Sequence, residues 1–375
     1  MPLRPIDNLA VALATTYPEL DSIRQVVERD DVYLVGGSVR DLLLGQGRSD
    51  IDIVVIGDAA ALAERLGAEV VQHERFATAK VRLDGHQLDI AGARAESYPH
   101  PGSLPVVKPT GDIAVDLGRR DFTVNAMAIP LTGEPRLIDP HGGQADLGAG
   151  LLRVMSTHSF EDDPTRALRA ARYAARFGFA LEEETRALLH KANLSSVSVD
   201  RRDADLLRLA AEPAAGRGFE LLAEWGLLEL RHGGARLASA VGDLLTRAPW
   251  NGVAPLERAV LAAALGPAGR EEELAATKPE RPSQAVALAE ACDPVELVLA
   301  RALGAEWLDR YLSSWRLVQL EIGGDDLLAA GVPEGPAVGR GLAAALQRKL
   351  DGEIEGRDQE LEAALVGAGE ADGVA

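Results

Sequence analysis

A short apolar segment that runs into two consecutive glycines constrains the fold of this chain more than any other feature. Residues 32–35 are expected to form a strand, and residues 38–44, directly after Gly36 and Gly37, a helix. A strand that ends in two glycines and opens a helix brings bare backbone N–H groups close to an anion, at the positive end of the helix dipole. Arg40 adds a fork of donors. The segment predicts a phosphate cradle, although for the glycine pair alone a tight turn without a ligand is an equal alternative.

Asp50 and Asp52 lie one residue apart at the start of the next expected strand, residues 52–56. Alternate residues of a strand point to the same face, so both carboxylates face one way while Ile51 and Ile53 face a core. Two acids held together need a cation, and Mg²⁺ takes carboxylate and phosphate oxygens. A capping Asp followed by a surface Asp is the poorer alternative, because apolar residues flank the pair. Both aspartates are therefore expected to bind metal and to act in catalysis.

Two carboxylates that hold divalent metals can activate an attacking hydroxyl and stabilise the leaving oxygen of an in-line phosphoryl displacement. Asp89 lies between apolar neighbours in the expected strand 87–91. It is a candidate third metal ligand, and a solvent-facing strand acid is an equal alternative. The sequence thus predicts a phosphoryl-transfer site that uses Mg²⁺.

Composition limits the class of protein. A chain of 375 residues can bury more than one core, and its net charge of -19 argues against non-specific coating of nucleic acid, so any RNA contact must be local. The single Cys292 excludes an internal disulfide and fits a reducing cytoplasm. We find neither a signal-peptide pattern nor an apolar stretch long enough to cross a bilayer. A cytoplasmic protein without a membrane partner is expected, and its oligomeric state is open.

The first third of the chain alternates short strands and helices, which is typical of an α+β domain on a small sheet. Asp58 is expected to cap a helix that ends at Leu66. Residues 80–83 and 87–91 are expected to form a hairpin. Residues 93–116 are rich in proline and glycine and are expected to form a long, mobile loop beside the site. From residue 160 onward the apolar spacing is helical almost throughout.

Four segments with these features occur in a fixed order: residues 34–45, 49–54, 119–128 and 162–170. Together they resemble the signature of the class II tRNA nucleotidyltransferases, which include the CCA-adding enzymes, and of the bacterial poly(A) polymerases. The clear similarity runs from about Tyr33 to Phe179, and a weaker one continues through residues 323–328 and 335–336.

The resemblance implies a polymerase-β-like nucleotidyltransferase head with a small mixed or antiparallel sheet, followed by an all-α neck, body and tail. We expect the catalytic head at residues 1–145 and a helical neck with the base-selecting helix at residues 146–212. The body and tail at residues 213–375 are expected to bind RNA.

The family adds nucleotides to an RNA 3′ end without a nucleic-acid template, using magnesium and nucleoside triphosphates. By resemblance, Asp50 and Asp52 bind the metals, and Gly36, Gly37 and Arg40 lie against the triphosphate. Asp121 would accept a hydrogen bond from the ribose 2′-hydroxyl, and a helix cap is a compatible alternative. The other residues assigned to nucleotide binding in that motif are Arg119, Arg120 and Asn125, of which the arginines hold phosphates or the primer end.

Asp163 and Arg166 are three residues apart, so on a helix they share a face. One acceptor and one donor fork match cytosine and adenine, each of which offers an exocyclic amine beside a ring-nitrogen acceptor. Uracil and guanine present the reverse pattern and would leave buried groups unpaired. The pair therefore predicts a protein template for C and A. An exposed ion pair worth roughly 0.2–0.5 kcal/mol is the alternative.

A basic stripe continues along the same expected helix at Arg169, Arg172 and Arg176. Such stripes are usually solvated surface, but this one can also face the cleft and the incoming RNA or triphosphate, so Arg166 is assigned to nucleotide binding first, with Arg169 and Arg172 behind it. Residues 198–202 lack the Gly-Glu-Arg turn that is common in the family, which weakens the case for Arg201. No histidine is followed by Asp, so no phosphatase activity is expected.

The resulting hypothesis is an enzyme that builds or repairs the CCA end of tRNA from CTP and ATP. The RNA 3′-hydroxyl attacks the α-phosphate in a two-metal reaction. Alternatives are enzymes that add only CC or only A, and poly(A) polymerase, although an acidic chain without a basic C-terminal extension favours compact tRNA. A non-catalytic RNA-binding relative is a further alternative, and the intact acids of the motifs argue against it.

Overall fold

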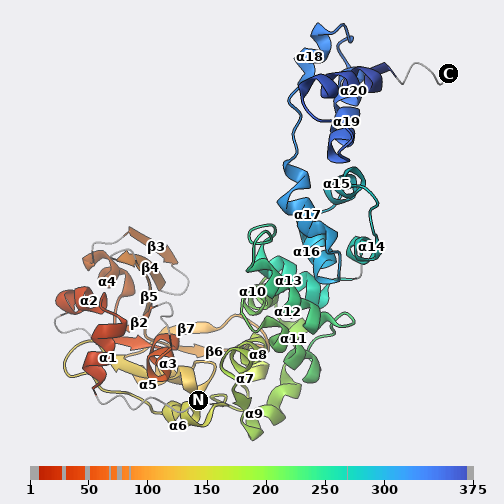
Figure 1. The fold of residues 1–375 in the computed structure, drawn as a ribbon. Coiled ribbons are helices and arrows are strands. Elements are labelled where there is room, and N and C mark those ends of the chain that lie inside the picture. Colours follow the sequence, from red (N-terminus) through yellow and green to blue (C-terminus); the bar gives the residue numbers. More distant parts are fainter. Residues whose placement is uncertain are drawn as a thin grey trace. The chain divides into compact units, whose positions relative to one another are not determined.

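The computed structural model describes residues 8–27, 31–46, 51–66, 69–73, 78–83, 86–267 and 269–369. The chain forms two compact units (Figure 1). The first comprises residues up to 209 together with 221–228, and the second comprises 210–220 together with 229 onward. Asp50 and the tip of the expected hairpin at residues 84–85 lie outside the described residues.

A mixed six-stranded sheet forms the centre of the first unit, with strand order β3-β4-β5-β2-β1-β8. Strands β2 and β5 are parallel, and the other neighbours are antiparallel. The small mixed sheet expected from the sequence is thereby confirmed. The strands are β1 (Val32–Val35), β2 (Ile51–Val55), β3 (Glu69–His73), β4 (Thr78–Leu83), β5 (His86–Gly92) and β8 (Ala128–Pro130).

Helices α3 (Gly37–Leu44) and α4 (Ala59–Arg65) pack against this sheet. Asp58 caps α4 as expected, because its carboxylate accepts hydrogen bonds from the backbone N–H groups of Ala60 and Ala61. On β2, Ile51 and Ile53 are buried, whereas Asp52 between them is partly exposed on the other face. The strand therefore presents its carboxylate at the edge of an apolar core.

The expected mobile loop at residues 93–116 is wrong. Strands β6 (Arg94–Ser97) and β7 (Val106–Pro109) form an antiparallel ribbon, and α5 (Ile113–Gly118) follows, capped by Asp112. The prolines that suggested a loop lie in the turn and at the end of β7, where a two-stranded ribbon tolerates a missing N–H donor.

The remainder of the first unit is mostly helical. Helix α8 begins after Pro164, buries Leu168 and several alanines, and ends at Gly178, whose φ of +70° continues the chain in the left-handed region. The elements are α1 (Leu9–Thr16), α2 (Leu20–Val26), η2 (Thr123–Asn125), α6 (Gly143–Ala149), β9 (Leu151–Leu152), α7 (Ser159–Asp162), α8 (Thr165–Phe177), β10 (Ala180–Leu181), α9 (Glu183–Ala187), η3 (Leu188–Lys191), η4 (Leu194–Ser196) and α10 (Val199–Ala210).

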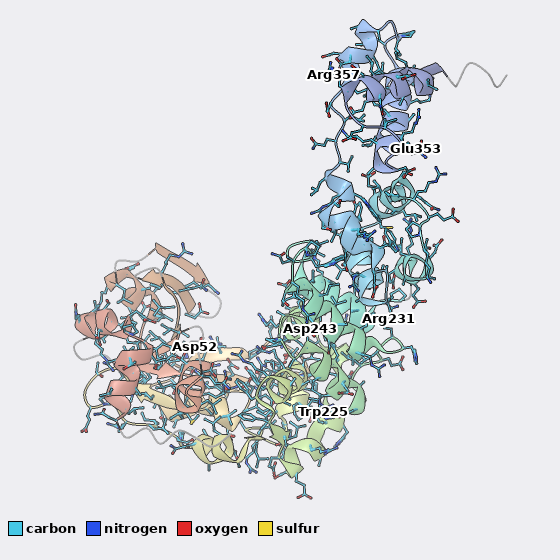
Figure 2. All side chains as sticks on the ribbon, in the orientation of Figure 1. Asp52, Trp225, Arg231, Asp243, Glu353 and Arg357 are labelled. Carbon is cyan, nitrogen blue, oxygen red and sulfur yellow. The ribbon has the colours of Figure 1, made fainter. Side chains whose placement is uncertain are left out.

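The second unit is helical throughout its described residues, as the apolar spacing predicted. Arg231, which Figure 2 labels, pairs with Glu271 and Glu272 at the start of α14. A separate apolar cluster joins the last three helices. The helices are α11 (Ala215–Glu224, shared between the units), α12 (Gly234–Leu245), α13 (Leu256–Leu265), α14 (Arg270–Ala276), α15 (Pro282–Glu290), α16 (Pro294–Ala302), α17 (Trp307–Ser313), η5 (Trp315–Leu317), α18 (Gly324–Ala329), α19 (Pro336–Leu350) and α20 (Arg357–Gly369).

The α+β fold with a helical remainder agrees with the expected fold class. Among the described helices, none combines the length and apolarity needed to span a membrane. The division into head, neck, body and tail is finer than the two units and stays a prediction.

Candidate active site

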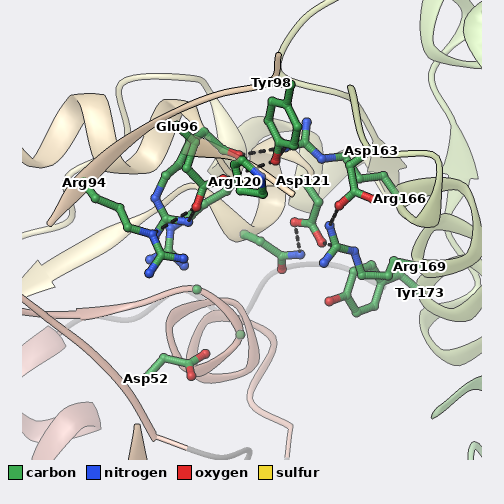
Figure 3. A pocket seen from close by; sticks show the side chains of 15 residues that line it. Asp52, Arg94, Glu96, Tyr98, Arg120, Asp121, Asp163, Arg166, Arg169 and Tyr173 are labelled. Carbon is green, nitrogen blue, oxygen red and sulfur yellow. Dashed lines mark hydrogen bonds and ion pairs between the residues drawn. The ribbon is translucent and has the colours of Figure 1, made fainter. Parts of the chain in front are cut away.

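A pocket of about 400 Å³ lies in the first unit, where β2, β6, the N-terminus of α3 and helix α8 meet (Figure 3). Charged side chains of both signs dominate its lining, which suits a polyanionic ligand held by arginines. It is lined by Gly36, Gly37, Asp52, Arg94, Glu96, Tyr98, Pro105, Arg119, Arg120, Asp121, Asn125, Asp163, Arg166, Arg169 and Tyr173.

The glycine pair forms the turn into α3, as expected. Gly36 has φ +69°, a conformation that favours glycine, and a Cβ there would lie 2.8 Å from Nη1 of Arg120 and 3.2 Å from Oδ2 of Asp52. Backbone, guanidinium and carboxylate therefore converge at one point. The turn leaves the first N–H groups of α3 facing an anion site.

Asp52 and Asp89 are register partners on the parallel strands β2 and β5, so their side chains lie on the same face. Oδ1 of Asp89 is buried and forms no hydrogen bond with the described residues, and its ion-pair partner, Nζ of Lys80, lies 3.6 Å away. Carboxylate oxygens are the ligands that a hard divalent cation prefers. No group of three metal-ligating residues occurs within the described residues, and Asp50, the expected partner of Asp52, lies outside them.

Arg119 and Arg120 are held by one buried carboxylate that the sequence did not single out. Asp116 accepts a hydrogen bond from Arg119 at 2.9 Å and from Arg120 at 3.1 Å. Burial opposes its ionisation, but the two guanidinium groups outweigh that effect and lower the pKa of Asp116. Both arginines are thereby fixed with their remaining donors at the pocket.

Asp121 is held in its ionised form inside the pocket. Its Oδ1 accepts hydrogen bonds from the N–H of Phe122 at 2.8 Å and from Nδ2 of Asn125 at 2.9 Å, and Nε of Arg169 lies 3.5 Å from Oδ2. Burial raises the pKa of Asp121, but Arg169 and these donors lower it more. An ionised carboxylate with a free lone pair can accept a hydrogen bond from a hydroxyl.

Arg40 and Arg172 do not lie among the described residues that line the pocket. The guanidinium of Arg40 is buried; it donates to Asp41 at 2.8 Å and to Asn125 at 2.7 Å, and it stacks on the rings of Tyr173 and Phe177. Arg40 thus braces the glycine turn against α8. Arg172 stacks on Tyr173, and a nucleotide contact of either arginine stays a prediction.

The expected shared helical face of Asp163 and Arg166 is wrong, although both residues line the pocket. Asp163 has extended backbone before Pro164, and its Oδ1 accepts hydrogen bonds from N and Oγ1 of Thr165. It therefore precedes α8 as a capping residue, because a residue before proline avoids the helical region. Arg166 lies in the first turn of α8.

Arg166 is fixed on three sides. It donates from Nη1 to Oγ of Ser159 at 3.1 Å, and from Nη2 to the hydroxyl of Tyr98 at 3.3 Å and to the carbonyl of Arg119 at 3.0 Å. Its Nε is buried without a hydrogen-bond partner within the described part of the chain. A buried, unpaired donor in a pocket is a position where a ligand acceptor is expected.

Sequence reasoning missed three pocket residues on β6 and directly after it. Glu96 accepts hydrogen bonds from Arg94 at 3.0 Å, from Arg119 at 2.9 Å and from the hydroxyl of Tyr98 at 3.2 Å. Burial raises the pKa of Tyr98, which keeps its phenol protonated. The signal was present, because Arg94, Glu96 and Tyr98 alternate with a strand period.

The departure of residues 198–202 from the family pattern weakened the case for Arg201, yet its side chain contacts the pocket residue Asp163. It donates to Oδ1 of Asp163 at 3.0 Å and to the carbonyl of Gly102, in the β6–β7 turn, at 2.8 Å. Its position on α10 was predictable, but its partners lie far away in sequence. The pocket thus combines the glycine turn, the carboxylates of Asp52 and Asp121, and the fixed guanidinium of Arg166. Together these groups suit the transfer of a nucleotide from a triphosphate.

Comparison with known proteins agrees with this chemistry. A family model described as the poly A polymerase head domain matches residues 32–153. A CC-adding tRNA nucleotidyltransferase of Deinococcus radiodurans is 35% identical over 356 residues, which cover 91% of this chain and 90% of that relative. The chain therefore belongs to the tRNA nucleotidyltransferase and poly(A) polymerase family, whose members are nucleotide-transferring enzymes.

Two further comparisons refine the similarity. An A-adding tRNA nucleotidyltransferase of Halalkalibacterium halodurans is 46% identical over 164 residues, which cover 42% of this chain and only 38% of that relative. The solved Thermotoga maritima CCA-adding enzyme complexed with tRNA is 28% identical, with a TM-score of 0.73 over 98% of this chain and 99% of that one. Enzymes of this family generally use divalent metal ions.

Proposed function

We propose that this protein adds cytidine and adenosine nucleotides to the 3′ end of tRNA, using CTP and ATP and no nucleic-acid template. One observation carries the proposal: a single pocket brings together the glycine turn, Asp52, Asp121, and the pair Asp163 and Arg166. The full-length similarity to a CC-adding enzyme and the match to a CCA-adding enzyme bound to tRNA support it. The reaction is attack of the RNA 3′-hydroxyl on the α-phosphate, with release of pyrophosphate.

Mg²⁺ is the proposed metal, held by Asp52 with Asp50 and with Asp89 from the neighbouring strand. When bound, the metal supplies positive charge that activates the hydroxyl and neutralises the phosphates. The N–H groups after Gly36 and the guanidinium of Arg120 face the triphosphate from the other side, because both adjoin Asp52. These residues orient the α-phosphate for in-line attack.

Base selection is proposed to rest on Asp163 and Arg166. Both side chains are held by the protein. Asp163 is held by Thr165 and Arg201, and Arg166 is held by Ser159. Neither side chain therefore has to be ordered when the nucleotide binds. The open Nε of Arg166 suits a ring nitrogen of cytosine or adenine, and Oδ2 of Asp163 suits the exocyclic amine. Ribose selection is assigned to Asp121.

Addition of CC alone is the second candidate, because the relative that is similar over nearly the whole chain is CC-adding. By contrast, a stretch of 164 residues of the chain is 46% identical to part of an A-adding enzyme. The residues of the pocket do not distinguish C from A by themselves, since both bases offer the same hydrogen-bonding edge.

The test offers purified protein three tRNAs, ending before CCA, after the first C and after CC, with each labelled triphosphate and Mg²⁺. Addition of two C residues and then one A, followed by termination, is expected. Arrest after CC assigns the second candidate, and an A ladder of indefinite length or no extension would overturn the proposal. Asp52→Asn is expected to lower incorporation by at least about 1,000-fold while RNA binding persists.

The proposal includes a cytoplasmic location, which a tRNA substrate and the single thiol of Cys292 support. It also assigns residues 1–145 to catalysis, 146–212 to base selection and 213–375 to RNA binding. Removal of the helical body is expected to weaken tRNA binding more than nucleotide binding.

A further inference from the structure

The guanidinium of Arg169 lies between two carboxylates of the pocket. Its Nε is 3.5 Å from Oδ2 of Asp121, and its Nη2 is 3.6 Å from Oδ2 of Asp163. Figure 3 shows the guanidinium between these two side chains, and all three residues line the pocket. One cation therefore adjoins both the carboxylate proposed to select the ribose and the carboxylate proposed to select the base.

In both carboxylates, one oxygen is held by neighbouring donors and the other faces Arg169. Oδ1 of Asp121 accepts hydrogen bonds within its own segment, residues 121–125, and Oδ1 of Asp163 accepts them from Thr165 and Arg201. The two Oδ2 atoms face Arg169 at distances that are longer than a hydrogen bond. Each Oδ2 can therefore still accept a hydrogen bond from a ligand.

Arg169 suits the alignment of two oxygens better than any other basic residue. A guanidinium holds its nitrogen atoms in a rigid plane, so that Nε and Nη2 keep a fixed orientation to each other. Nε is buried and has no hydrogen-bond partner within the described residues. The two ion pairs of Arg169 therefore join carboxylates that are far apart in the sequence, at positions 121 and 163.

Under the proposed function, the ribose 2′-hydroxyl donates to Asp121 and the exocyclic amine of the base donates to Asp163. Both donors belong to one nucleoside, so the two accepting oxygens have to be correctly placed relative to each other. We propose that Arg169 is a positioning residue that aligns both oxygens, so that sugar selection and base selection depend on one side chain. This inference rests on the proposed function.

A direct contact of Arg169 with the triphosphate is the alternative role. CTP, dCTP and UTP carry the same phosphates, so loss of such a contact lowers kcat/KM for all three by the same factor. Loss of the alignment instead lowers kcat/KM for CTP more than for dCTP and UTP. The ratios between the nucleotides therefore distinguish the two roles.

The test compares Arg169→Gln and Arg169→Lys with Asp121→Asn and Asp163→Asn. Arg176→Gln is the matched control, because Arg176 is exposed in the last turn of the same helix and is not among the described residues that line the pocket. Incorporation of a single nucleotide from CTP, dCTP or UTP is measured on tRNA that lacks CCA, with Mg²⁺. Thermal unfolding of each variant is followed by circular dichroism.

Arg169→Gln is expected to lower both the CTP to dCTP ratio and the CTP to UTP ratio of kcat/KM roughly tenfold. Asp121→Asn should lower mainly the first ratio, and Asp163→Asn mainly the second. Arg169→Lys keeps the charge but not the planar fork, so both ratios should still fall, by about threefold or more. This variant decides the test if Arg169→Gln does not fold. The Arg176→Gln control should match the wild type.

Unchanged ratios in the folded Arg169 variants would overturn the inference, even if activity falls equally with all three nucleotides. A fall in only one ratio would also overturn it, because Arg169 would then support a single carboxylate. If the wild-type protein extends no RNA, the proposed function fails. Affinities for the three nucleotides, measured by calorimetry without RNA, give the same two ratios in that case, since binding requires no catalysis.

Discussion

Nη2 of Arg201 donates a hydrogen bond to Oδ1 of Asp163 across 3.0 Å, so that α10 holds the residue that precedes α8. The same guanidinium donates to the carbonyl of Gly102 in the β6–β7 turn. One side chain of α10 therefore joins the β6–β7 ribbon to Asp163, the carboxylate proposed to select the base. The consequence is that Asp163 cannot rotate away without breaking contacts to two other elements.

Arg201→Lys is expected to relax base choice, because an ammonium cannot form both bonds with the geometry of a fork. The ratio of kcat/KM for CTP to that for UTP should fall roughly tenfold. Single-nucleotide incorporation measures the ratio. Arg202→Lys is the matched control, since Arg202 pairs with its neighbour Asp203 and with no other residue that the structure describes. Equal ratios in the two variants would contradict the role of Arg201.

Tyr98→Phe removes the hydroxyl that accepts from Arg166 and donates to Glu96. Loss of one such hydrogen bond is worth about 1 kcal/mol, so kcat/KM for CTP and ATP should fall roughly fivefold. Tyr33→Phe on β1 is the control, because Tyr33 packs in an apolar cluster away from the pocket. If both variants lose activity equally, the hydroxyl of Tyr98 has no special part in orienting Arg166.

Gly36→Ala places a methyl group 2.8 Å from Arg120 and 3.2 Å from Asp52 at a φ of +69°. The backbone strain alone costs about 1 kcal/mol, and the contact displaces the groups that face the triphosphate. Incorporation is expected to fall at least about 100-fold, as for misplaced reacting groups. Gly133→Ala is the control, because Gly133 also has a positive φ but its new Cβ would meet open space. This variant should be less stable in urea unfolding and should keep its activity in the incorporation assay.

Asp116→Asn tests the carboxylate that holds Arg119 and Arg120. Removal of one partner of a buried ion pair is expected to lower the free energy of unfolding by about 3 kcal/mol at pH 7. The folded-state pKa of Asp116 lies below its ordinary value of 3.8, so its stabilising effect is complete above pH 3.8 and is lost as the pH falls through the folded-state pKa. Urea unfolding from pH 7 to pH 3 should show the two proteins converging only at the acidic end. A constant difference over that range would argue against this ionised pair.

The strands of the sheet and the glycine turn beside the pocket were predictable, because the alternation of apolar residues in a strand and a pair of glycines are both local signals in the sequence. Strand β1 occupies its expected residues, and α4 begins at its expected cap, Asp58. The ribbon β6–β7 was missed because proline density outweighed the alternation of Arg94, Glu96 and Tyr98. Pairing of strands decides such a case, and pairing is not visible in a single segment.

The local geometry of Asp163 and Arg166 was predicted less well than their location in the pocket. Helical spacing suggested a shared face for Asp163 and Arg166. Asp163 instead has extended backbone before Pro164, and Arg166 lies in the first turn of α8. Contacts across the fold, such as those of Arg201 and Asp116, depend on tertiary packing and were not deducible from spacing. The roles of the site residues in nucleotide binding stay predictions until the variants are measured.

Arg40 of the glycine turn lies against Tyr173 and Phe177, on the same helix that carries Arg166. An exchange of α8 between relatives with different nucleotide preferences would therefore also replace the aromatic residues that support Arg40 beside the glycine turn. Chimaeras built to alter the added base should keep Tyr173 and Phe177, the ring partners of Arg40, in the grafted helix. Otherwise a defect in turnover would be mistaken for a change of preference.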